Sequence, residues 1–170
     1  EQLQKNHTSL RAIIHNASDW VPDDPKQTAV NIDRMLKVHV SAPYQINLAL
    51  KDQLKKGANP HSDIIHISDY VAHKGSKKHI AYAASKAALE NMSLSFAAAF
   101  APSVKVNTVA PALMLFNEAD TDDYKKHAIA KALMAKEGGY EEFINTIDFL
   151  LKSTYMTGRT LHLDGGRHLK

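Results

Sequence analysis

The feature that most constrains the fold is the alternation of short apolar runs with longer segments of helical periodicity. Four short runs are rich in apolar and β-branched residues: 11–18, 63–68, 104–111 and 158–166. Three longer segments repeat their apolar residues at helical spacing: 29–56, 80–100 and 140–153. Strands that alternate with helices indicate a parallel sheet with helices on both faces. The sequence therefore predicts an α/β, Rossmann-like, doubly wound fold.

Prolines and polar stretches set the expected boundaries of these elements. Pro43 lies inside the segment 29–56 and predicts a kink or a break there. The Ala-rich segment 80–100 is expected to be one helix that ends before Pro102. Residues 69–79 read as a polar loop, and 112–139 as a loop-and-helix segment.

Composition narrows the class of protein. With 170 residues, 44% hydrophobic and 23% charged, the chain is expected to form a single globular domain over 1–170. No cysteine is present, which rules out disulfides and thiolate metal sites and is typical of a reducing, cytoplasmic environment. The net charge of +3 is scattered and no apolar run is long enough for a membrane span, so neither a nucleic acid nor a membrane is an expected partner. The ten histidines lack zinc-helix spacing, so no metal site is predicted.

Tyr82 and Lys86 stand four residues apart at the head of the predicted helix 80–100. Residues at this spacing share one helix face, and an ammonium beside a phenol favours the phenolate. We therefore expect Lys86 to lower the pKa of Tyr82 and to make it a proton donor or acceptor. Taken alone, the pair is more often two polar residues of an ordinary amphipathic helix.

Three of the predicted strands lead into loops at 15–18, 68–70 and 110–111, and the first two of these carry polar side chains. The carboxyl ends of parallel strands meet at one edge of a sheet, where ligands of open α/β folds bind. These residues are therefore expected to gather beside Tyr82.

Four ordered motifs resemble the short-chain dehydrogenase/reductase family over essentially the whole chain. The "YAASK" of 82–86 is similar to its Tyr-x-x-x-Lys, "HNAS" to its Asn-Asn-Ala-Gly, "VNTVAPA" to its strand before Pro-Gly, and "LDGG" to its C-terminal turn. The position thirteen residues before the tyrosine, where the family has its catalytic serine, is Asp69. This aspartate, with Trp20 after "HNAS", resembles the pteridine reductase group.

The resemblance implies roles for named residues. Tyr82 would donate the proton, Lys86 would hold the nicotinamide ribose, and Asp69 would orient or relay the proton as a third catalytic residue. Trp20 would stack on the pterin ring. The implied cofactor-binding set is Asn16, Ala17, Ser18, Ser68, Tyr82, Lys86, Pro111, Leu113 and Met114, and the implied substrate-binding set is Ser18, Trp20, Asp69 and Tyr82.

The implied function is the NADPH-dependent reduction of a dihydropterin by a homo-oligomer, a tetramer or a dimer. Dihydromonapterin, giving tetrahydromonapterin, and dihydrofolate, giving tetrahydrofolate, are the candidate substrates. Two alternatives stay open. One is a reductase of the same family acting on another carbonyl or imine. The other is a non-catalytic remnant that serves as an oligomerisation module.

Two departures from the family pattern bear on these expectations. The glycine-rich turn that holds the cofactor pyrophosphate is missing, since the seven glycines lie at 57, 75, 138, 139, 158, 165 and 166. The chain is therefore expected to hold only the C-terminal part of the fold, without its first strand–helix units, and to be inactive alone. His39 stands where the family commonly has an asparagine. It is either a relay residue or an ordinary helix histidine.

Overall fold

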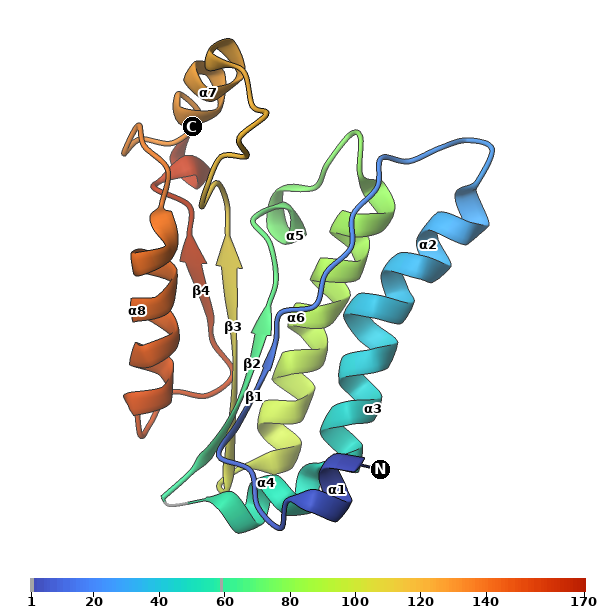
Figure 1. Cartoon of the computed structure of the whole chain (residues 1–170), viewed down its shortest axis with the longest axis vertical. Helices are drawn as coiled ribbons and strands as arrows, with labels where there is room; N and C mark the ends of the chain where they lie inside the picture. Colours follow the sequence, from blue (N-terminus) through green and yellow to red (C-terminus); the bar gives the residue numbers. More distant parts are fainter. Residues whose placement is uncertain (1, 59) are drawn as a thin grey trace.

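A four-stranded parallel sheet forms the centre of the molecule (Figure 1). The computed structural model describes residues 2–58 and 60–170. The strands are β1 (Ala12–His15), β2 (Ser62–Ile67), β3 (Val104–Pro111) and β4 (Thr160–Leu163), and they lie in the order β1-β2-β3-β4. The predicted α/β class and the parallel sheet are confirmed.

The helices follow the predicted alternation. They are α1 (Gln2–Asn6), α2 (Thr28–Leu36), the π-helix η1 (Lys37–Ser41), α3 (Ala42–Ala49), α4 (Lys51–Gly57), α5 (Val71–Lys74), α6 (Ile80–Phe100), α7 (Asp122–Ile129), α8 (Gly139–Lys152) and the 3₁₀-helix η2 (Arg167–Leu169). The predicted bounds of α6 and β3 are confirmed. One short helix, α5, was not predicted and lies in the segment 69–79, which the sequence indicates as loop.

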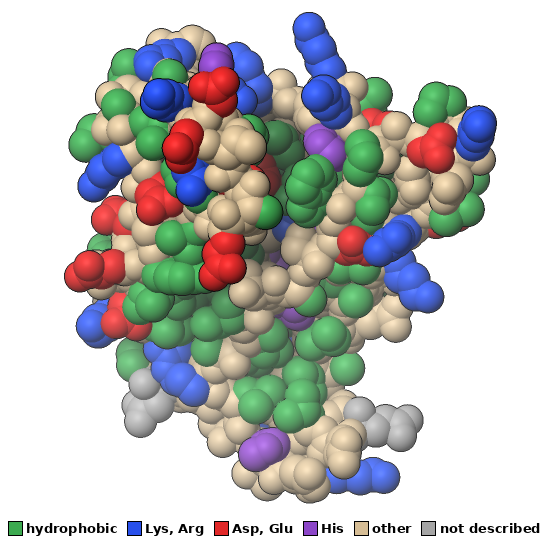
Figure 2. All heavy atoms as spheres, turned by 45° about the horizontal axis from the view of Figure 1, so that its top comes forward, with side chains coloured by type: hydrophobic (Ala, Val, Ile, Leu, Met, Phe, Trp, Pro, Cys, Tyr) green, Lys and Arg blue, Asp and Glu red, His purple; other side chains and the backbone are tan. Residues whose placement is uncertain are grey.

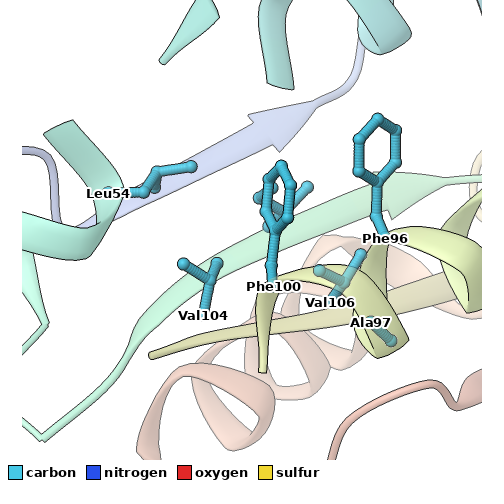
Figure 3. Packing of buried hydrophobic residues seen from close by; sticks show 7 residues of the cluster. Leu54, Phe96, Ala97, Phe100, Val104 and Val106 are labelled. Carbon is cyan, nitrogen blue, oxygen red and sulfur yellow. The ribbon is translucent and has the colours of Figure 1, made fainter. Parts of the chain in front are cut away.

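Apolar residues of β2 and β3 alternate between the two faces of the sheet, as strand geometry requires. One face packs against α4 and α6 through a cluster shown in Figure 3: Leu54, Ile64, Phe96, Ala97, Phe100, Val104 and Val106. The other face packs against α8 through a second cluster: Ile65, Ile67, Val109, Ile147 and Leu150. The prediction of helices on both faces is therefore confirmed.

The position of α8 gives the third crossover an unusual hand. The strand order runs in one direction without a reversal, and the helices that connect β2 to β3 and β3 to β4 lie on opposite faces. A doubly wound sheet usually places helices on both faces by reversing its strand order. Here the crossover through α8 instead has the opposite hand from the one through α6, and crossovers are almost always of one hand.

Pro43 does not break the helical segment, although the sequence predicted a kink or a break there. The Ala42 amide donates to the Lys37 carbonyl five residues back, which widens this turn into the π-helix η1. Pro43 then follows as an early residue of α3. The interruption expected at the proline is thus a π-helical turn just before it, and that turn contains His39.

Candidate active site

The three predicted loops meet at the carboxyl edge of the sheet. Because β1, β2 and β3 are parallel, their carboxyl ends lie together, and the first turn of α6 begins at the same edge. Figure 2 brings this edge forward and shows a hollow between the part of the molecule that carries α7 and α8 and the part that carries α2 and α6. The ends of these strands and the start of α6 therefore meet at one edge, as predicted.

Tyr82 and Asp69 form the central contact of this edge. The Tyr82 hydroxyl donates a hydrogen bond of 2.9 Å to the Asp69 carboxylate. The other carboxylate oxygen accepts a 2.8 Å bond from the Val71 amide, at the start of α5, which fixes the orientation of the side chain. A phenol and a carboxylate held together beside a ligand-binding edge are an arrangement suited to proton transfer.

The expectation that Lys86 lowers the pKa of Tyr82 is wrong for this structure. Burial raises the pKa of Tyr82, and the negative charge of Asp69 and its hydrogen bond raise it further, while Ser18 acts in the opposite direction. The nearest charge to the hydroxyl is negative, whereas the Lys86 ammonium lies 5.6 Å from the centre of the ring. Tyr82 is therefore protonated at neutral pH, as a proton donor must be.

Lys86 is buried, with its side chain pointing back toward β2. Its Nζ donates a 2.9 Å bond to the Ile67 carbonyl, the last residue of that strand. Burial lowers the pKa of Lys86 to about 8, and the negative charge of Asp69 opposes this effect. The carbonyl occupies one of the three N–H donors of the ammonium.

Asp69 lies among groups that act on its protonation in both directions. Burial raises the pKa of Asp69, against the hydrogen bonds from Val71 and Tyr82 and the charges of Lys86 and Arg167. Arg167 comes from the turn after β4, and its guanidinium lies over the Tyr70 ring, 4.7 Å from the centroid. The sequence motifs gave no indication of Arg167. Only the fold brings the end of the chain to the loop after β2.

His39 is fully buried and joins the loop after β1 to α6. Its Nε2 lies 2.9 Å from the Ser18 hydroxyl and accepts from the Asp19 amide at 3.3 Å. Its Nδ1 lies 2.8 Å from the Ser85 hydroxyl, and Ser85 donates in turn to the carbonyl of Tyr82 at 2.7 Å. Burial first, and then the charge of Lys86, lower the pKa of His39 to about 4.

The other predicted residues of the loop after β1 face solvent. Asn16, Ala17 and Ser18 are exposed, and Trp20 is 63% exposed. The Trp20 ring packs edge-on against His79, with 4.5 Å between ring centroids. An exposed indole is available to stack on a planar ligand.

Four predicted cofactor residues bond to groups other than Tyr82 and Asp69. The buried Ser68 hydroxyl donates to Glu90 at 2.6 Å, so it faces the interior. The Pro111 carbonyl accepts from the Tyr70 amide, while the Leu113 and Met114 carbonyls accept from the amides of Gly138 and Gly139 at the start of α8. Leu113 also lines a cavity of about 360 Å³ between the ends of β3 and β4 and the segment 128–142, and Tyr82 is not among its lining residues.

Two findings concern residues 2–58 and 60–170 as a group. No helix within them is both long and apolar enough to cross a bilayer. No three histidine or carboxylate side chains within the same ranges are placed to hold a metal ion.

Comparison with known proteins agrees with this geometry. The family described as "Enoyl-(Acyl carrier protein) reductase" matches residues 1–168. A dihydromonapterin reductase of Klebsiella pneumoniae is 53% identical over 170 residues, covering 98% of this chain and 70% of the relative. A dihydromonapterin reductase of Escherichia coli is 49% identical over 171 residues, covering 100% of this chain and 71% of the relative.

A solved structure shares the fold. The FolM alternative dihydrofolate reductase 1 of Brucella canis, in complex with NADP, is 26% identical to this chain, with a TM-score of 0.84. The match covers 95% of this chain and 64% of that protein. The chain thus spans a little under two thirds of this structural relative and about 70% of the Klebsiella relative.

Proposed function

The chain belongs to the short-chain dehydrogenase/reductase family, and from that premise we propose that it carries the active site of an NADPH-dependent dihydropterin reductase. Dihydromonapterin, reduced to tetrahydromonapterin, is the first candidate substrate, and dihydrofolate, reduced to tetrahydrofolate, is the second. The names of the two enterobacterial relatives and of the Brucella structure support this choice. The observation that carries it is the hydrogen bond between Tyr82 and Asp69 at the carboxyl edge of the sheet.

Lys86 is suited to hold a nicotinamide ribose. Its ammonium is buried at the edge of the sheet and gives one N–H to the Ile67 carbonyl, so its remaining donors fit ribose hydroxyl groups. The exposed residues Asn16, Ala17 and Ser18 offer a second set of groups that could contact the cofactor. When bound, reduced nicotinamide supplies the hydride of the reaction.

Tyr82 supplies the proton in the proposed reaction. A dihydropterin is reduced at a C=N bond, where a hydride adds to the carbon and a proton to the nitrogen. Tyr82 is protonated at neutral pH and is held by Asp69, so its hydroxyl is the proton donor in place. Asp69 accepts the hydrogen bond that orients this hydroxyl, and Trp20 offers an exposed ring face for the flat substrate.

Kinetic assays of the natural protein test this proposal. We expect oxidation of NADPH with dihydromonapterin or dihydrofolate, and weaker turnover with an enoyl thioester, the substrate class that the family description names. A folded protein that binds NADPH but turns over neither dihydropterin would overturn the pterin assignment. The homo-oligomeric state and the cytoplasmic location stay predictions, to be checked by light scattering and by cell fractionation.

A further inference from the structure

The π-helix η1 places His39 between two elements of the site. A π-helical turn carries one extra residue per turn, and such turns are frequent at functional sites. Here the turn lies against α6 and carries a fully buried histidine whose two ring nitrogens contact different elements. One nitrogen faces the exposed loop after β1, and the other faces the helix that carries Tyr82.

The protonation of each nitrogen follows from its partners. The Asp19 amide can only donate, so the Nε2 that it contacts carries no proton. The Ser18 hydroxyl, 2.9 Å from the same nitrogen, must then donate to it. Neutral imidazole carries one proton, which lies on Nδ1 and is donated to Ser85. Every bond of His39 therefore has a fixed direction.

These bonds form a chain from Ser18 through His39 and Ser85 to the backbone of Tyr82. Ser85 donates to the Tyr82 backbone carbonyl, and the ring of His39 stands edge-on to the Tyr82 ring, with 5.4 Å between centroids. Ser18 is also close enough to the Tyr82 hydroxyl to affect its ionisation. We call Ser18, His39, Ser85 and Tyr82 the His39 network.

We propose that His39 is a positioning residue that ties the loop after β1 to the tyrosine helix, and that it acts through Ser18 and the Asp19 amide. This inference rests on the proposed function, since His39 would act on the same site without touching the substrate. With His39 in place, the Ser18 hydroxyl is held beside Tyr82. When Tyr82 has given up its proton, that hydroxyl can rotate from His39 to the phenolate oxygen, with no proton transferred.

Two substitutions separate the halves of this tether. A glutamine places its side-chain oxygen near the position of imidazole Nε2, so His39→Gln keeps an acceptor for Ser18 and Asp19. An asparagine matches Nδ1, so His39→Asn keeps only the Ser85 contact. We expect kcat to stay within about threefold in His39→Gln and to fall about tenfold in His39→Asn, the worth of one to two hydrogen bonds.

A matched pair at His66 provides the control. His66 is also buried, and its Nδ1 contacts Ser93, eight residues after Ser85 on the same helix. His66→Gln and His66→Asn should lower the melting temperature and leave kcat unchanged. If the His39 variants change only the melting temperature as well, His39 has a merely structural role and the proposal fails.

Measurements without substrate separate this inference from the proposed function. Long-range ¹H–¹⁵N NMR should show His39 with a protonated Nδ1 and a bare Nε2 at neutral pH. Hydrogen exchange of the Asp19 amide should be slow in the wild type and in His39→Gln, and faster in His39→Asn. An Nε2–H tautomer, or equal exchange in both variants, overturns the tether. Failure of dihydropterin turnover with these signatures intact overturns only the proposed function.

Discussion

Two buried histidines use the same local chemistry for different purposes. His39 and His66 both lie against α6, and both have Nδ1 close to a serine of that helix, Ser85 at 2.8 Å and Ser93 at 2.7 Å. They differ at the other nitrogen. Nε2 of His39 contacts the exposed Ser18, whereas Nε2 of His66 lies 3.1 Å from the buried amide of Asn47.

The polar groups around His66 bond to one another. Asn47 also accepts from His15, whose ring stacks on His66 at 5.0 Å, and the hydroxyl of Thr108 donates to Ser93. We call these five residues, His15, Asn47, His66, Ser93 and Thr108, the His66 network. It links β1, α3, β2, α6 and β3 beneath the active site. A satisfied polar network inside a protein fixes the packing of the elements that it joins.

The two networks differ in whether they reach the surface at the proposed active site. Both networks orient α6 against its neighbours, but only the His39 network ends at a hydroxyl that solvent and a ligand can reach. The same pairing of histidine with a helix serine joins α6 to the sheet in one network and, in our proposal, positions Tyr82 in the other. The following predictions test the roles of the two networks and of the residues that they hold.

The largest expected effect comes from removing the hydroxyl of Tyr82. Tyr82→Phe deletes the proposed proton donor and leaves the ring packed against His39. We expect kcat to fall about 10³-fold, within the range for loss of a general acid, with little change in melting temperature. Tyr44→Phe, on the half-exposed outer side of α3, is the control and should retain activity. Full activity in Tyr82→Phe would contradict the assignment of the donor.

The next effect is on stability and concerns His66. His66→Ala leaves a cavity and removes partners from Asn47 and Ser93. We expect the free energy of unfolding to fall by roughly 2–4 kcal/mol, measured by urea denaturation, while kcat per folded molecule is kept. His7→Ala, at an exposed position, should change neither quantity. A loss of kcat in folded His66→Ala would show that the two networks are coupled.

Acid should destabilise both networks together. Burial lowers the pKa of His66 to about 3 and, with the charge of Lys86, that of His39 to about 4, against about 6.5 in the unfolded chain. The unfolded state therefore binds more protons below about pH 6.5, so stability is full above this pH and falls as the pH is lowered toward the folded pKa values. At about pH 5 the loss should be about 2 kcal/mol for each histidine.

Denaturation as a function of pH measures this effect. Between about pH 6 and pH 5, His66→Gln should reduce the slope of unfolding free energy against pH by the contribution of about one proton. His39→Gln should do the same. A slope that is unchanged in both variants would mean that neither histidine is held neutral in the folded protein.

Much of the fold was predictable because the apolar periodicity indicates the elements and residues such as proline mark their ends. The apolar repeat and Pro102 predicted the bounds of α6, and the β-branched run predicted β3. The opposite hand of the α8 crossover was not predictable, since helices on either face give the same apolar pattern. The π-helical turn before Pro43 was also missed, because a proline signal shows that the helix is perturbed but not how it adjusts.

The candidate site likewise has residues that could be predicted from the sequence and residues that could not. Tyr82, Lys86 and Asp69 follow from motif spacing, and the parallel strands bring their loops together. The direction of the Tyr82 pKa shift was mispredicted, because spacing indicates that Lys86 is near but not that its ammonium turns to the Ile67 carbonyl. Ser85 and Arg167 were missed because their roles depend on tertiary contacts, with His39 in one case and with Tyr70 in the other.

The smallest expected effect is at the exposed end of the loop that His39 holds. Trp20 is 63% exposed and contacts His79, so Trp20→Leu should change stability by no more than about 0.5 kcal/mol. Loss of an aromatic face for the substrate should raise KM for the dihydropterin about three- to tenfold, while KM for NADPH is kept. Trp20→Phe should restore most of the lost affinity.

Because Trp20 and His39 act on the same loop, Trp20→Leu combined with His39→Asn measures their coupling. If His39 holds the loop in place for both cofactor and substrate, the effect of Trp20→Leu on KM should shrink when His39 is also replaced, since a displaced loop no longer presents the indole. The pair Trp20→Leu and His66→Asn lacks a shared element at the site, so its effects should be independent. Equal coupling in the two pairs would show that the His66 network also acts on the loop after β1.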